Sequence, residues 1–72
     1  MTDAEIFKRN VKRICKQKHM KMGCVDLEAG YNENYLHYLV GKHVEPSDEA
    51  VRCYAKALGV KPERLTEGFY DN

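Results

Sequence analysis

The side chains of this 72-residue chain that could support catalysis or metal binding are scattered cysteines, histidines and carboxylates. Cys15 and His19 stand four residues apart, so on a helix they would share one face. Two ligands are too few for a zinc site, and no pair of cysteines has the CxxC spacing. We therefore expect no bound metal and interpret the cysteines as structural thiols in a reducing compartment.

Asp26, Glu28, His37 and His43 are the candidates for acid–base chemistry. Their positions do not combine a nucleophile, a base and a group that orients the base. A chain of this length also offers little room for a substrate pocket. We expect no enzymatic activity, no cofactor and no small-molecule substrate.

Charge is distributed unevenly along the chain, although the formal net charge is only +1. Residues 1–21 contain seven lysines and arginines against two acidic residues, whereas residues 22–49 contain six acidic residues against one lysine. The basic segment is suited to phosphate, but a solvated helix face has the same pattern. The acidic middle segment argues against contact with a polyanion.

The length of the chain is that of one small domain over residues 1–72. No stretch approaches the roughly 18–20 apolar residues of a membrane span. The acidic start lacks the apolar segment of a signal peptide. We therefore expect a cytoplasmic protein with no membrane partner.

Apolar spacing predicts an all-α chain with five helices. Thr2 and Glu5 have the spacing of a capping box, which predicts that the first helix begins at Asp3. Ser47 is placed to cap the fourth helix, and Pro62 fits the first turn of the fifth. The expected helices cover residues 3–18, 22–29, 33–40, 48–58 and 62–66, followed by a short tail at 67–72.

Residues 22–41 have the pattern of two helices joined by a tight turn. Gly30 stands where a helix end requires a positive φ, and Asn32 is placed to cap the second helix. The apolar residues expected at the helix crossing are Val25, Ala29, Leu36 and Leu39. This pattern predicts a helix-turn-helix unit.

In this order the elements resemble the phage-repressor and Cro-like family of helix-turn-helix proteins, of the xenobiotic-response-element (XRE) type. The matching residues extend from Phe7 to Leu65 without an insertion. They include Asn10-Val11-Lys12-Arg13-Ile14, Ala29-Gly30, Tyr35-Leu36, Pro46-Ser47 and Ala55-Lys56-Ala57-Leu58-Gly59-Val60. The resemblance implies a compact five-helix, lambda-repressor-like bundle. It also implies a sequence-specific DNA-binding transcriptional regulator, of repressor type.

The resemblance places the helix at 33–40 in a major groove, with its first residues at base edges. The implied DNA-binding residues are Met22, Asn32, Glu33, Asn34, His37, Tyr38, Lys42 and His43. Asparagine can pair with adenine, and a carboxylate can accept from cytosine N4 although it repels phosphate. Met22 and Asp26 stand where the family often has a glutamine and a small residue, so Asp26 must point outward or find a partner.

Two functions remain open on this fold. The first is binding of double-stranded DNA by a homodimer, with Phe69 and Tyr70 of the tail as candidates for the dimer contact. The second is a protein-interaction module, such as an antitoxin, an antirepressor or a phage-encoded adaptor, with weak or no DNA binding. The acidic segment around the predicted helix pair motivates the second function.

Cys15 and Val40 occupy positions where members of the family often pair an arginine with a glutamate. Replacing both partners of a buried ion pair can be neutral, whereas replacing one leaves a buried charge uncompensated. We therefore expect the Cys15 sulfur to be shielded from solvent and in contact with Val40.

Overall fold

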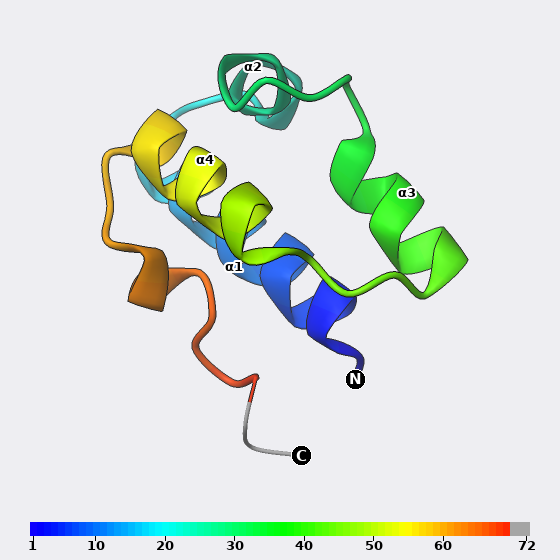
Figure 1. Cartoon of the computed structure of the whole chain (residues 1–72). Coiled ribbons are helices and arrows are strands. Elements are labelled where there is room, and N and C mark those ends of the chain that lie inside the picture. Colours follow the sequence, from blue (N-terminus) through cyan, green and yellow to red (C-terminus); the bar gives the residue numbers. More distant parts are fainter. Residues whose placement is uncertain (70–72) are drawn as a thin grey trace.

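The computed structural model describes residues 1–69 as four α-helices followed by one 3-10 turn (Figure 1). In chain order these elements are α1 (Asp3–Gln17), α2 (Met22–Glu28), α3 (Tyr35–Lys42), α4 (Asp48–Leu58) and η1 (Pro62–Arg64). The described part of the chain contains no strand, so the all-α prediction is confirmed. None of its helices is long and apolar enough to cross a membrane.

The starts of α1 and α4 confirm the predicted caps. The Thr2 hydroxyl accepts from the backbone N–H of Glu5, and the Glu5 carboxylate accepts from the backbone N–H of Thr2. The Ser47 hydroxyl accepts from the backbone N–H of Ala50. These bonds satisfy N–H groups that a helix leaves unpaired in its first turn.

The prediction of a fifth helix over 62–66 is wrong, because only the 3-10 turn η1 forms there. The buried Asn10 side chain of α1 donates to the carbonyl oxygens of Leu65 and Glu67, at 2.9 and 3.0 Å. These carbonyls are thereby bonded to α1, and the chain then turns at Gly68, which has a φ of 96°. The five-helix bundle is corrected to four helices and a 3-10 turn.

The predicted bounds of the third helix, 33–40, are also wrong, because α3 begins and ends two residues later. Asn32 is therefore not its cap. The residue before the helix is Asn34, in the left-handed conformation with a φ of 67°, and its side chain makes no capping bond. Gly41 lies inside the helix, and the chain leaves α3 through His43 at a φ of 55°.

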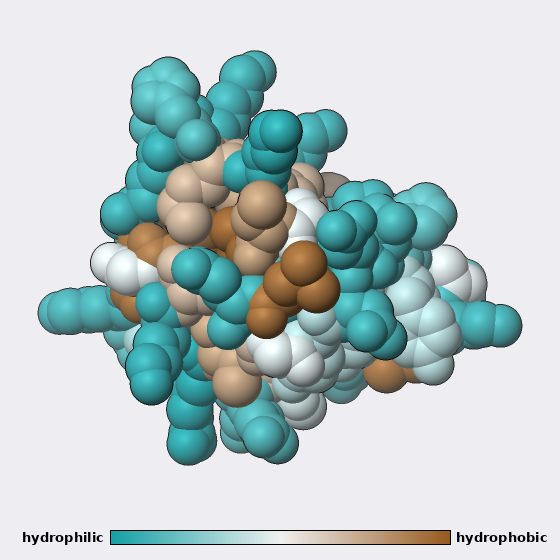
Figure 2. Space-filling model, turned by 90° about the horizontal axis from the view of Figure 1, so that it is seen from above, coloured by the Kyte–Doolittle hydropathy of each residue, from teal (hydrophilic) through white to brown (hydrophobic). Residues whose placement is uncertain are grey.

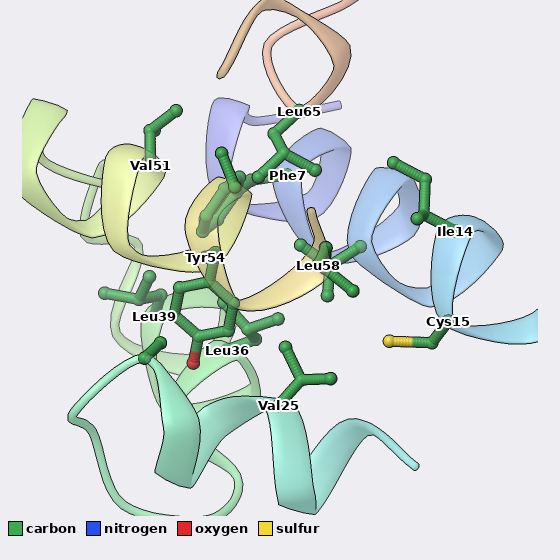
Figure 3. Close-up of a cluster of buried hydrophobic side chains, with 14 residues drawn as sticks. Phe7, Ile14, Cys15, Val25, Leu36, Leu39, Val51, Tyr54, Leu58 and Leu65 are labelled. Atoms are coloured by element: carbon green, nitrogen blue, oxygen red, sulfur yellow. The ribbon is translucent and has the colours of Figure 1, made fainter. Parts of the chain in front are cut away.

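The four helices enclose one apolar core (Figure 3). Its largest fully buried side chains are Tyr54, Phe7, Ile14, Leu36, Leu39, Leu65, Val11 and Val25. Burying a side chain of this size stabilises the fold by about 1.5–3 kcal/mol relative to its exposure. The members come from every helix and from the residue after η1, so the core fixes α3 against α1 and α4.

The Cys15 thiol points into this core, and the predicted shielding is confirmed because the residue is 2% exposed (Figure 3). Burial, followed by the charge of Asp26, raises the pKa of this thiol. Val40 is half-buried and lines a hollow with Met1 and four residues of α1, none of which is Cys15. The structure gives no support to the expected contact between Cys15 and Val40.

We expect substitution by alanine to have opposite effects on stability at Gly41 and at Gly30. A Cβ built on Gly41 meets no atom within 4 Å beyond the neighbouring residues and backbone of its own helix, and the φ of Gly41 is not positive. Gly41→Ala should therefore stabilise the fold by about 0.5–1 kcal/mol. Gly30 has a φ of 93°, so Gly30→Ala should destabilise the fold by about 1 kcal/mol or more. Denaturant unfolding of both variants checks this. A Gly41→Ala variant less stable than the parent would contradict the interior position of Gly41 in α3.

Candidate nucleic-acid interface

The position of α3 depends on a buried carboxylate. Asp26 of α2 is 3% exposed, and its Oδ2 atom accepts from the backbone N–H of Asn34 at 3.0 Å. Its Oδ1 atom accepts from the hydroxyl of Tyr54, in α4. Asp26 thus joins α2 to the start of α3 and to α4. The carboxylate does not point outward, and it has its hydrogen-bond partners inside the protein.

Tyr54 is fully buried and packs edge-on against Phe7, with ring centroids 5.5 Å apart. Burial raises its pKa, and the hydrogen bond to Asp26 and the charge of that carboxylate raise it further. The hydroxyl therefore keeps its proton and remains a donor to Asp26. A hydrogen bond to a charged group contributes about 1.5–3 kcal/mol.

The structure gathers three of the predicted DNA-binding residues around one small hollow between α1, α2 and α3. Met22, Asn34 and His37 line it together with Lys8 of α1. The Lys8 ammonium lies 3.4 Å from Nδ1 of His37. Seven of the eight predicted residues are exposed, and the exception is the half-buried Met22.

The other predicted residues do not line this hollow, although the Glu33 side chain lies beside Gly23 at its edge. Asn32 and Glu33 belong to the turn before α3 and not to the helix. The Glu33 side chain lies over Gly23, where its carboxyl carbon would be 3.5 Å from an added Cβ. Its charge is thus at the first turn of α2, which the helix dipole favours. Lys42 and His43 lie at the opposite end of α3 from Asn34.

α1 lies beside α3 and has a row of cations along this border. No residue of α1 is among the DNA-binding residues predicted from the sequence. Lys8, Arg9 and Lys12 line the hollow that also contains Val40 of α3. Within residues 1–69, Arg13 is the one basic residue of α1 that forms an ion pair, with Glu67 at 3.5 Å. The net charge of +5 over residues 1–21 was the signal that could have located this row.

The other border of α3 has the opposite charge. Glu45, Asp48 and Glu49 are all exposed in the connection to α4 and in the first turn of that helix. They outnumber the nearby Lys42. A phosphate at this end of α3 would therefore meet a net negative charge, which weakens the expectation that Lys42 and His43 bind phosphate.

Comparison of the chain with protein-family models, characterised proteins and solved structures found no match. Among residues 1–69, no three or more histidine, cysteine or acidic side chains are grouped to hold a metal ion. The predicted dimer contact falls at the end of the chain, where Phe69 is half-buried against the core and Tyr70 lies outside the described residues. Function must therefore be argued from the arrangement of α1, α2 and α3.

Because the pKa of Tyr54 is raised, we expect the stability of the fold to depend on pH in the alkaline range. Above a pH of about 10 the unfolded chain loses the Tyr54 proton while the folded chain keeps it, so stability falls as pH rises. Tyr54→Phe removes this contribution. As pH rises above this value, the free energy of unfolding of the variant should fall less steeply than that of the parent. The two slopes should differ by about 1.4 kcal/mol per pH unit.

At neutral pH the same variant should be less stable than the parent by about 1.5–3 kcal/mol, because Asp26 loses a buried donor. Urea unfolding of parent and variant over a pH series measures both effects. Stability curves that stay parallel up to strongly alkaline pH would contradict the proposed titration of Tyr54.

Proposed function

We propose that this protein binds double-stranded DNA sequence-specifically and acts as a transcriptional regulator, of repressor type. The observation that carries the proposal is the exposed polar face of α3 beside the cations of α1. In this proposal α2 and α3 form a helix-turn-helix unit in a lambda-repressor-like domain, and α3 enters the major groove. An α-helix fits this groove, which is about 12 Å wide.

The orientation of α3 supports this assignment of faces. Leu36 and Leu39 are buried, so the opposite face of the helix points to solvent. That face presents His37 and Tyr38, with Asn34 directly before the helix. We assign base contacts to these three residues, since an amide pairs with adenine and an aromatic ring can contact a thymine methyl group. Asn32 and Glu33, in the turn, are assigned no place in the groove.

The cations of α1 supply the non-specific part of the affinity in this proposal. Lys8 lies beside His37, and Arg9 and Lys12 follow on the same border of α3. α1 has five basic residues against two acidic ones, although one of the acids, Glu5, lines the same hollow as Lys8, Arg9 and Lys12. Phosphate contacts of this kind position a protein on DNA without selecting a sequence.

The protein-interaction module is the second candidate function, with an antitoxin, an antirepressor or a phage-encoded adaptor as examples. The exposed carboxylates Glu45, Asp48 and Glu49 favour it, because they would repel phosphate from the α4 border of α3. Binding of DNA and its dependence on salt distinguish the two candidates.

Lys12→Ala tests the role of α1. The variant should bind all duplex sequences more weakly, and the slope of log affinity against log salt should flatten by about one unit. Lys61→Ala is the matched control, because Lys61 lies between α4 and η1, on the side of the molecule away from α3 (Figure 1). Fluorescence anisotropy over a salt series measures both variants. Equal slopes for Lys12→Ala and the parent would remove α1 from the contact surface.

Asn34→Gly tests base recognition without straining the backbone, because glycine adopts the left-handed conformation that Asn34 has. Discrimination at one base pair should fall by about 1–3 kcal/mol, while binding to generic DNA changes little. Asn32→Gly, in the turn, is the matched comparison and should leave the preference unchanged. Sequencing of sites selected from random duplexes compares them. An identical preferred site for Asn34→Gly and the parent would contradict this assignment.

A further inference from the structure

Four tyrosine rings connect the core to the surface beside α3. Tyr31 and Tyr35 are stacked with centroids 4.1 Å apart, and Tyr54 lies next to both, at 5.8 and 6.4 Å. Tyr38 extends the series from Tyr35, at 6.3 Å. All these pairs are within 25° of parallel. Exposure rises from none at Tyr54 to 53% at Tyr38, so the outer rings are accessible to a partner.

Carboxylates accompany these rings. Tyr31 stacks on Tyr54 of α4, and Glu49 is exposed in the first turn of the same helix. Burial raises the pKa of Tyr31, and Tyr35, Cys53 and Glu49 raise it further. Glu45 lies in the connection between α3 and α4 and is also exposed. Within residues 1–69 neither carboxylate forms an ion pair. We call this set, Tyr31, Tyr35, Glu45 and Glu49, the aromatic–acidic surface.

Aromatic faces and carboxylates attract the same class of ligand, a lysine or arginine side chain. A cation is held over a tyrosine ring within about 6 Å of its centroid, and a neighbouring carboxylate adds Coulomb attraction. A phosphate backbone would be repelled here. The chemistry of this surface therefore points to a basic protein segment and not to a nucleic acid.

The chain itself contains such a segment. Lys12 and Lys16 stand one helical turn apart on the exposed side of α1, and neither forms an ion pair within the described residues. The exposed Lys12 and Lys16 of one copy are opposite in charge to the exposed Glu45 and Glu49 of another, so the two surfaces are complementary. We propose that the aromatic–acidic surface of one copy binds the basic face of α1 of a second copy.

This contact is heterologous, because it joins different surfaces of the two copies. The pair then keeps one free surface of each kind, so association continues as an open series. The contact also uses cations that the proposed function assigns to DNA phosphates. DNA and a second copy therefore compete for α1, and this competition, unlike the association itself, rests on the proposed function.

Two charge-reversed variants test the association without DNA. One carries Glu45→Lys with Glu49→Lys and keeps α1, and the other carries Lys12→Glu with Lys16→Glu and keeps the aromatic–acidic surface. Sedimentation velocity at low salt should show that the parent associates and that each variant alone is monomeric. The equimolar mixture should associate again, because each surface of one variant then meets a surface of opposite charge on the other. High salt should dissociate the parent.

A parent that is monomeric at low salt would overturn the proposal, and its binding of an oligolysine peptide would then assign the surface to another protein. Association of either variant alone at the parent's affinity would also overturn it, because the contact would lie elsewhere, as at the C-terminal tail. Circular dichroism checks that both variants are folded. If Glu49→Lys disturbs the start of α4, the neutral Glu49→Gln should weaken association severalfold, and an unchanged affinity would overturn the proposal.

Adding a generic DNA duplex to the associated parent tests the competition separately. The duplex should convert the association products into complexes that contain DNA and no copy–copy contact. A protein that associates but does not bind the duplex would refute the proposed function and leave the association intact. A protein that binds DNA while its copies stay associated through these surfaces would refute the competition.

Discussion

The carboxylate of Asp26 is the interaction on which the arrangement of α2, α3 and α4 depends. It is a buried charge, and such a charge is tolerated only where donors replace the water that it has lost. Here the donors are the hydroxyl of Tyr54 and the backbone N–H of Asn34. The bond to Asn34 matters for geometry, because it holds the residue directly before α3 in its left-handed conformation. The first turn of α3 is therefore fixed to the body of the protein.

Several parts of the fold could be predicted because their causes are local. The capping box at Thr2, the Ser47 cap and the positive φ of Gly30 each depend on residues within a few positions. The start of α3 could not be predicted in this way. Asn32 has the right type for a cap, but the carboxylate that determines where the helix begins is Asp26, eight residues before Asn34. The fifth helix failed for a similar reason, since Asn10 of α1 bonds the carbonyls that follow η1.

In the candidate site, too, the features with local causes could be predicted, and those that depend on distant residues could not. The exposed residues of α3 followed from the spacing of Leu36 and Leu39, because a helix that buries one face presents the other. The spacing of these two leucines does not indicate which other elements lie beside that face. The structure places Lys8 next to His37, and it places the exposed Glu45, Asp48 and Glu49 in the connection to α4 and its first turn, so the two borders of α3 differ in charge. This asymmetry separates a surface suited to phosphate from a surface suited to a basic protein segment.

In the function that we propose, DNA binds to the exposed face of α3 and to the adjoining cations of α1. The most direct measurement is an NMR titration of the isotopically labelled protein with a short duplex, following each backbone amide. We expect the largest shifts at Asn34, His37 and Tyr38 and along α1 at Lys8 and Lys12, with little change near Glu49. Shifts confined to the region of Tyr31 and Glu49, or no shifts at low salt, would contradict the proposed function.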